Sequence, residues 1–542
     1  MPDRCLRPVS ALMALSIGLA GCADSALVLA PVGADVPLKP RAGTGSDGIA
    51  STTTRTPSGA RDFGLPPMAG LSFAAPQSLP DSRHVYSLAE LIDLAQTSNP
   101  ETRVSWERAR QAALGVGIVQ ALYLPVLTAT VVGGAQRQDG SRQIGDLPST
   151  DVGNSTRGAV PSVSLQWLIF DFGERDALKR AATDISLASD IVFNGTHQRI
   201  IYEVARSFYE FGAARQRVAI SLQAKADSSH LLAAAEDRFR HGIGTSVETA
   251  QARQVLAQAE FNLVQSRGAE RDVYHALLAA VGVSPLLTLS IEDASRRPLS
   301  PPPLAPLDAM VAQAIARRPD VQASYAASRA ARAGIDAAEA DLMPKVFLSA
   351  SDTYLTGNLN ITSLPSVPSL SSIGSGSSLA QATPATSAIP DLGSLNLNRS
   401  SSSINNVTVL GGIAIPLYDG GVRQAHVSEA RSRTDAAEAT VIRLEQAAAT
   451  EIVAADDALR SSLAAYRAAT VLVQASTLTE DAAFSAYRSG AGTLTAALET
   501  EQGLLVARLA QAQAHATALI AAATLAFSTG RLSSSDTVAG HS

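Results

Sequence analysis

The stretch Pro416-Leu417-Tyr418-Asp419-Gly420-Gly421 lies between a segment of alternating apolar and polar residues and a long segment without proline. A degenerate copy, Leu168-Ile169-Phe170-Asp171-Phe172-Gly173, lies 248 positions earlier and has the same kinds of segment on both sides. Glycine takes the positive φ that a sharp junction needs, and aspartate can cap the helix that follows. We therefore predict strand-to-helix turns that contain Asp171, Gly173, Asp419, Gly420 and Gly421.

An internal duplication extends from these turns in both directions. Toward the C-terminus, Arg240-His241-Gly242-Ile243-Gly244-Thr245 matches Arg488-Ser489-Gly490-Ala491-Gly492-Thr493, again 248 positions apart. Toward the N-terminus, Pro100 and Pro125 match Pro319 and Pro344 at a separation of 219. Chance matches would not keep one separation for over a hundred residues, so we infer two copies of about 200 residues each, not a solenoid of short units.

Alternating apolar and polar residues predict a strand hairpin in each copy. Residues 126–136 are strand-like, and in residues 159–169 every second residue, up to Trp167 and Ile169, is apolar. Residues 407–417 repeat this alternation in the second copy. One apolar face and one polar face are typical of a barrel wall between lipid and water, and equally of an ordinary half-buried hairpin.

The second hairpin carries a long predicted loop. Residues 354–403 consist largely of Ser, Gly, Pro and Asn and contain almost no charge, which fits a surface loop. The extra length of this loop explains why the separation between the copies grows from 219 before the hairpin to 248 after it.

Long helices follow the hairpins. Asp176 to Arg240 and Val422 to Arg488 contain no proline, so each predicts a helix on the order of 100 Å in length. A Gly-x-Gly-Thr turn comes next in each copy, followed by a return helix that ends near Gly282 or Gly530. Alanine at many heptad-spaced positions predicts helices that pack on one another at close range.

The N-terminus predicts export and a lipid anchor. A basic start and a short apolar segment, residues 8–21, are typical of a secretory signal. The segment ends in Leu19-Ala20-Gly21-Cys22, which resembles the lipobox of bacterial lipoproteins and implies cleavage before Cys22 and lipidation of Cys22. Ala23, in place of the aspartate that retains lipoproteins at the inner membrane, favours the outer membrane. The alternative is a plain signal peptide with an incidental cysteine.

Composition excludes several classes of function. Lys plus Arg number 43 against 49 Asp plus Glu, so no nucleic-acid partner is expected. The two cysteines, Cys5 and Cys22, cannot form a zinc site or disulfide framework in the body of the chain. The eight histidines show no metal-ligand spacing, and no phosphate-binding loop or nucleophile elbow is present. We therefore expect no enzyme, no catalytic residue, no cofactor and no metal.

The order of helix, hairpin, long helix, tip turn and return helix, duplicated behind a lipobox, resembles the TolC-type outer-membrane efflux protein family, in its lipoprotein branch. The resemblance covers residues 84 to 535 and depends on the turns at 168–173 and 416–421 and on Pro125 and Pro344. It implies a mainly α fold with a membrane β-barrel part, in which a homotrimer forms a 12-stranded barrel and an α-helical periplasmic tunnel. Independently, four strands cannot close a barrel, since the smallest usual barrels have about eight.

The same resemblance implies where the pore entrance lies. The family's periplasmic entrance is at the two helix-tip turns, which here contain Gly242, Gly244, Gly490 and Gly492. Glu248 and Glu499 follow these turns and are the candidates for acidic rings that favour cations. The alternative for each is a solvated carboxylate that suits the start of a helix.

These inferences define the predicted organisation and function. The predicted parts are a signal peptide (1–21), a lipidated linker (22–82), two efflux-protein repeats (83–298 and 299–535) and a C-terminal tail (536–542). The resemblance implies an outer-membrane duct for drugs or other small molecules, with a periplasmic adaptor, an inner-membrane pump of the resistance-nodulation-division or ABC type, and outer-membrane lipid as partners. One alternative is the channel of a type I protein secretion system. A second is a coiled-coil scaffold lipoprotein without a pore.

Overall fold

The computed structural model describes residues 83–142, 150–299, 306–357 and 404–532. Met1–Leu79 and Pro80–Ser542 form separate units, and every described residue belongs to the second. The predicted signal peptide, the linker with Cys22, the C-terminal tail and most of the loop at 354–403 lie outside the described residues.

The secondary structure repeats in the order that the sequence predicts. The first copy contains β1 (Val85–Tyr86), α2 (Leu88–Ser98), α3 (Pro100–Ala121), β2 (Val126–Arg142), β3 (Thr150–Phe170), α4 (Glu174–Arg240) and α5 (Ser246–Val281). The second contains α6 (Leu307–Ile315), α7 (Pro319–Ala340), β5 (Lys345–Gly357), β6 (Ile404–Ala414), α8 (Val422–Ser489) and α9 (Leu494–Ser528). Strand β4 (Ser290–Ile291) and the 3₁₀ turn η2 (Ala294–Arg296) lie between them. Helices α3 and α7 begin 219 positions apart, and α4 and α8 begin 248 apart, which confirms the duplication.

The prolines at 100 and 319 begin helices because a first-turn residue needs no amide hydrogen. Pro100 starts α3 directly after Asn99, whose side chain accepts a hydrogen bond from the Glu101 amide at 2.9 Å. Pro319 starts α7 directly after Arg318, whose side chain makes no cap hydrogen bond. Helices α2 and α3 are therefore separate, with a break at Asn99.

The helices pack through several small apolar clusters instead of one thick core. The largest cluster joins α2, α4 and α5 through side chains that are at most 2% exposed, including Leu91, Ile200, Phe208 and Leu278, and it reaches α9 at Leu519, which is 8% exposed. Other clusters consist mainly of alanine and leucine, such as that of α8 with α9. Alanine at the contacts lets long helices approach closely over their whole length.

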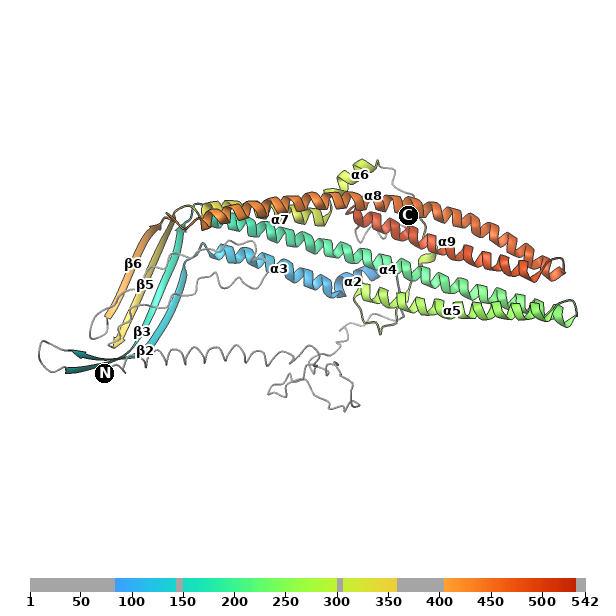
Figure 1. Cartoon of the computed structure of the whole chain (residues 1–542), viewed down its shortest axis with the longest axis horizontal. Coiled ribbons are helices and arrows are strands. Elements are labelled where there is room, and N and C mark those ends of the chain that lie inside the picture. The colour runs from blue at the N-terminus through green and yellow to red at the C-terminus, as the bar shows by residue number, and fades with distance from the viewer. Residues whose placement is uncertain (1–82, 143–149, 300–305, 358–403, 533–542) are drawn as a thin grey trace, which may run out of the picture. The chain divides into compact units, whose positions relative to one another are not determined.

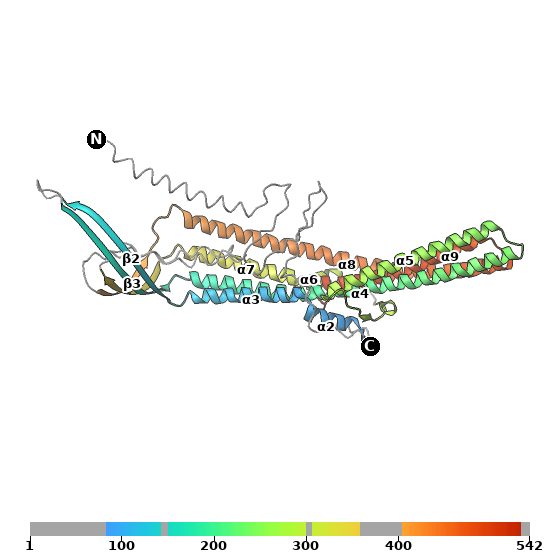
Figure 2. The same ribbon diagram turned by 90° about the horizontal axis from the view of Figure 1, so that it is seen from below.

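A single four-stranded antiparallel sheet joins the two copies. Its order is β2-β3-β5-β6, so the central pair, β3 with β5, connects the hairpin of one copy to the hairpin of the other. The sheet lies at one end of the helices, and the α4–α5 and α8–α9 turns lie at the opposite end (Figures 1 and 2). This arrangement separates two places where function can be sought, the strand–helix junctions and the helix tips.

The sheet corrects three details of the prediction. A bulge between Leu168 and Phe170 shifts the alternation by one residue, so Phe170 and not Ile169 continues the face of Trp167. Strand β6 ends at Ala414, ahead of Pro416, which has no amide hydrogen to donate to a neighbouring strand. Strand β5 continues to Gly357, so the predicted loop at 354–403 begins too early.

Candidate functional site

The first strand–helix junction is built on a buried ion pair. The Asp171 carboxylate accepts hydrogen bonds from the amides of Gly173 at 3.3 Å and Arg175 at 3.0 Å, and so caps the start of α4. Arg175 Nε donates to Asp171 Oδ2 at 2.8 Å, and both side chains are 7% exposed. The guanidinium also donates to three main-chain carbonyls, those of Leu122 (3.1 Å), Leu168 (2.7 Å) and Ile169 (3.1 Å). Arg175 therefore ties α3, β3 and α4 together.

The second junction repeats this geometry at the surface. Asp419 accepts from the amides of Gly421 at 2.9 Å and Arg423 at 3.1 Å, and the Arg423 side chain pairs with it at 3.2 Å. The hydrogen bond from the Arg423 amide, aided by the Gly421 amide, holds the pKa of Asp419 below its ordinary value. Both side chains are only partly buried, at 25% and 30% exposure, so this pair is far more hydrated than Asp171–Arg175.

A lysine links the two junctions across the copies. Lys345 Nζ, at the start of β5, lies 2.8 Å from a Glu174 carboxylate oxygen of α4 and 2.7 Å from an Asp341 oxygen. Asp341 in turn accepts from Arg423 Nε at 3.1 Å. The glycines at these turns take the positive φ that we predict, with 97° at Gly173 and 90° at Gly421.

The aspartates of these junctions are predicted from the sequence, but their arginine partners are not among the predicted residues. Arg175 and Arg423 each follow an aspartate by four residues and lie 248 positions apart, the same separation as the turns themselves. They too are matched positions of the duplication, because they keep the separation of the turns.

The helix tips are closed by two matching turns. Gly242 and Gly490 have φ of 78° and 83°. A Cβ on Gly244 would lie 2.9 Å from the Phe239 nitrogen, and one on Gly492 would lie 3.1 Å from the Tyr487 nitrogen. The tips therefore need glycine at these positions for backbone conformation and for space.

The return helices begin with caps of unequal strength. Thr245 Oγ1 accepts from the Glu248 amide at 3.2 Å, and the Glu248 carboxylate accepts from the Thr245 amide at 3.2 Å, which completes a capping box. In the second copy, Thr493 accepts from the Ala496 amide at 3.2 Å, and alanine has no carboxylate to return the bond.

The two tips contact each other through Arg238 and Tyr487. Arg238 Nη1 donates to the Tyr487 carbonyl at 3.0 Å, and its guanidinium lies over the Tyr487 ring at 5.0 Å. Tyr487 is fully buried, and neither its hydroxyl nor Arg238 Nε has a hydrogen-bond partner among the described residues. Burial, and secondarily the negative charge of Glu248, raises the pKa of Tyr487, which the Arg238 charge opposes. We did not identify this contact from the sequence.

The structure places the two candidate pore-entrance carboxylates differently. Glu248 is engaged in the capping box of α5 and lies near Tyr487. Glu499 is exposed on α9. Among the described residues no hydrogen bond joins the two side chains, so a single chain does not bring them together.

Metal-ligand clusters and helices suited to cross a membrane are both absent from the described ranges. No group of three or more His, Cys, Asp or Glu side chains in these ranges is placed to hold a metal ion. Within the same residues, no helix has the length and apolar content to cross a membrane.

Comparison with known proteins decides the family. The model described as "Outer membrane efflux protein" matches residues 91–283 and 310–531. This chain belongs to that family. The first matched segment runs from α2 to the end of α5, and the second runs from α6 to the end of α9, so each corresponds to one copy of the duplication.

The relatives of this efflux protein have low sequence identity to it, but some of them match most of its length. Protein CyaE of Bordetella pertussis is 28% identical over 451 residues, which cover 81% of this chain and 84% of that protein. The pyoverdine export outer membrane protein OpmQ of Pseudomonas aeruginosa is 28% identical over 268 residues, or 49% of this chain and 55% of that protein. The solved structure of the outer-membrane channel OprN superposes with a TM-score of 0.64 at 20% identity, and covers 85% of this chain and 99% of that chain.

Family membership and the shared fold establish the broad assignment. The protein is a non-enzymatic efflux channel component with a mainly helical outer-membrane channel fold. Its location is the outer membrane, with a periplasmic extension. A coiled-coil scaffold without a pore, the second alternative from the sequence, does not agree with this family.

Proposed function

We propose that three copies of this chain form the outer-membrane duct of a tripartite export system that carries drugs or other small molecules. The observation that carries the proposal is the single four-stranded sheet, in which β2 and β6 have no further strand beside them among the described residues. Three copies would supply twelve strands and pair these edges, which closes a barrel.

The exposed face of the sheet supports a lipid environment for it. Val163 on β3 and Val407, Val409 and Ile413 on β6 are between 46% and 66% exposed in the single chain. Burying such side chains in lipid is favourable by about 25 cal/mol per Å² of apolar surface. The exposed aromatic rings of Phe170 and Tyr418, close to the strand ends, suit the boundary between lipid and water.

A small-molecule cargo is favoured over a protein cargo. One relative is named for pyoverdine export, and the lipobox at Cys22 is typical of the multidrug efflux branch. The channel of a type I protein secretion system is the alternative, because both branches use this fold. In either case the energy comes from an inner-membrane pump of the resistance-nodulation-division or ABC type, coupled through a periplasmic adaptor.

Lipidation of Cys22 is part of the proposal. Attached chains contribute about 0.8 kcal/mol per buried methylene, so several chains would hold the N-terminus at the outer membrane. Replacement of Cys22 by serine should abolish incorporation of labelled palmitate. Labelling of the Cys22→Ser variant equal to that of the natural chain would contradict this assignment.

Glu248 and Glu499 are proposed to lie at the periplasmic entrance. Three symmetry-related copies of either carboxylate would form a ring that favours cations over anions. Because Glu248 also caps α5, a substitution there would change both the charge and the stability of the helix. Glu499 is therefore the better position at which to test the effect of charge alone. Glu499→Gln should reduce the cation preference of the open channel without changing its stability.

Conductance of the purified protein in planar bilayers tests the channel. We expect discrete channels and a trimer that resists SDS, whereas a protein with neither property would refute the proposal. Deletion of the gene then separates the cargoes. Increased drug sensitivity with normal protein secretion supports the small-molecule duct, and the opposite result supports protein secretion.

A further inference from the structure

Helices α4 and α9 connect the helical hairpin of the first copy to that of the second, and polar contacts close this interface at two levels. Near the tips, the Ser228 hydroxyl of α4 donates to Glu501 Oε1 of α9 at 2.5 Å. About three helical turns farther from the tips, Arg217 Nη2 donates to Gln513 Oε1 at 3.3 Å.

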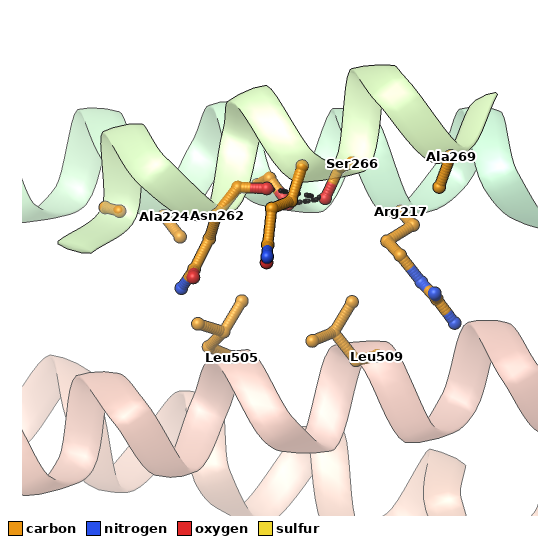
Figure 3. A pocket seen from close by; sticks show the side chains of 10 residues that line it. Arg217, Ala224, Asn262, Ser266, Ala269, Leu505 and Leu509 are labelled. Atoms are coloured by element: carbon orange, nitrogen blue, oxygen red, sulfur yellow. Dashed lines mark hydrogen bonds between the residues drawn. The ribbon is translucent and has the colours of Figure 1, made fainter. Parts of the chain in front are cut away.

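A cavity of about 390 Å³ separates these two contacts. Leu505 and Leu509 of α9 face side chains of α4 and α5 across it, among them Asn262 and Ser266 (Figure 3). Ala224, which also lines the cavity, is one turn from Ser228, and Leu505 is one turn from Glu501. The volume and the polar groups suffice for several water molecules, so protons can reach this part of the interface.

Glu501 of α9 lies among carboxylates from two other helices. The negative charges of Asp227 of α4 and Glu480 of α8 raise the pKa of Glu501. Asp481, the next residue of α8, raises the pKa of Glu480 in the same way. The nearby cations are engaged elsewhere. Arg508 lies 3.8 Å from Asp227, and Lys225 pairs with Glu260 of α5 at 3.0 Å. Among the described residues, no lysine, arginine or histidine forms an ion pair with Glu501.

This environment favours the neutral form of Glu501. Burial raises the pKa of Glu501, the Ser228 hydrogen bond opposes the rise, and the charges of Asp227 and Glu480 add to it, which brings the pKa to about 7. An ionised Glu501 would place a negative charge beside these neighbours at a partly buried contact.

We propose that Glu501 is a proton-dependent latch between the two helical hairpins. Protonated Glu501 lets α9 pack against α4 beside Ser228, and ionised Glu501 loosens that contact because its buried charge is repelled by Asp227 and Glu480. The latch does not depend on the proposed channel function, because it acts within one chain. That loosening of this contact favours opening of the helix tips is a further step, and only this step rests on the proposed channel function.

The direction of the pH dependence follows from linkage. The closed contact binds the proton more tightly than an opened, hydrated Glu501, whose ordinary pKa is 4.5. The closed contact is therefore most stable below about pH 4.5 and weakens as the pH rises toward about 7. Within this range its opening constant increases by up to about tenfold for each pH unit.

Hydrogen–deuterium exchange of the purified full-length protein in detergent tests the latch. The measured quantity is the protection of α4 and α9 amides around Ser228 and Glu501, corrected for the intrinsic pH dependence of exchange. In the natural chain we expect the opening constant to rise roughly tenfold between about pH 5.5 and pH 7. In Glu501→Gln, which stays neutral and keeps a similar shape, the corrected protection should not change with pH.

Two variants serve as controls. Glu499→Gln removes an exposed carboxylate two positions earlier on α9 and should keep the pH profile of the natural chain. Ser228→Ala removes the hydrogen bond to Glu501, so it should lower the protection across the pH range and retain the pH dependence. Corrected protection that is independent of pH in the natural chain, or a Glu501→Gln variant with the natural profile, would overturn the proposal. Both outcomes are independent of whether the protein conducts.

Discussion

Replacement of Arg175 by methionine probes the buried junction at the start of α4. Methionine fills a similar space but cannot pair with Asp171 or donate to the carbonyls of Leu122, Leu168 and Ile169. The variant leaves a carboxylate that is 7% exposed without its cation. Removing one partner of such a buried pair destabilises proteins by about 3–5 kcal/mol. Because Asp171 keeps the amide bonds of residues 173 and 175, we expect a loss of about 3 kcal/mol, the lower end of that range.

The duplication supplies a matched control in Arg423. Arg423→Met removes the equivalent side chain, but the Asp419–Arg423 pair is 25–30% exposed and better hydrated. Exposed and partly exposed pairs contribute roughly 0–1 kcal/mol. Since Arg423 also bonds Asp341, we expect a loss of about 1 kcal/mol from this variant, clearly below that of Arg175→Met.

Urea unfolding in detergent, followed by far-ultraviolet circular dichroism, measures both variants. Protein concentration must be the same in every sample, because the stability of an oligomer depends on it. Equal losses for Arg175→Met and Arg423→Met would refute the reasoning that burial decides the contribution of the pair. A double variant, Asp171→Leu with Arg175→Met, should recover part of the loss, because it leaves no uncompensated charge.

Three smaller perturbations test the tips and turns. Tyr487→Phe removes a buried hydroxyl that has no hydrogen-bond partner among the described residues. The free energy of unfolding should therefore stay constant or rise by up to about 1 kcal/mol. A decrease of more than about 1 kcal/mol would show that the hydroxyl has a partner. Thr245→Ala removes the hydroxyl that accepts from the Glu248 amide, and Thr493→Ala removes the one that accepts from the Ala496 amide, so each should cost about 1 kcal/mol, as seen in exchange of the first-turn amides. Gly421→Ala should destabilise the protein by about 1–2 kcal/mol, because Gly421 has a φ of 90° that alanine rarely adopts. Gly334→Ala, at a helical position with open space around it, should instead stabilise the protein by about 0.5–1 kcal/mol. A change of unfolding temperature in the same direction for both variants would contradict this account.

Much of the architecture was predictable because the sequence contains it twice. The separations of 219 and 248 between matched prolines and glycines correctly predicted the order of helices, strands and turns in both copies. The errors occur where a single residue interrupts a local pattern. The bulge before Phe170 and the strand end before Pro416 both depend on how a neighbouring strand pairs, which alternation alone does not encode.

The candidate sites were predictable in part. Glycine and aspartate at the turns are visible because backbone conformation restricts which residues can occupy them. Tyr487 and Arg238 come from helices that are far apart in sequence, and they meet only because the two hairpins pack side by side. Their residue types carry no local sign of that contact.

The comparison between Asp171–Arg175 and Asp419–Arg423 separates the two sources of information. The sequence alone indicates the duplication, the helix and strand periods and the turns, because these depend on interactions between residues close together in the chain. Only the tertiary structure shows that one copy of the aspartate–arginine pair is buried and the other hydrated, and that Glu501 lies among carboxylates of other helices. Burial and electrostatic environment depend on segments that folding brings together, so two sites with nearly the same local sequence acquire different energies.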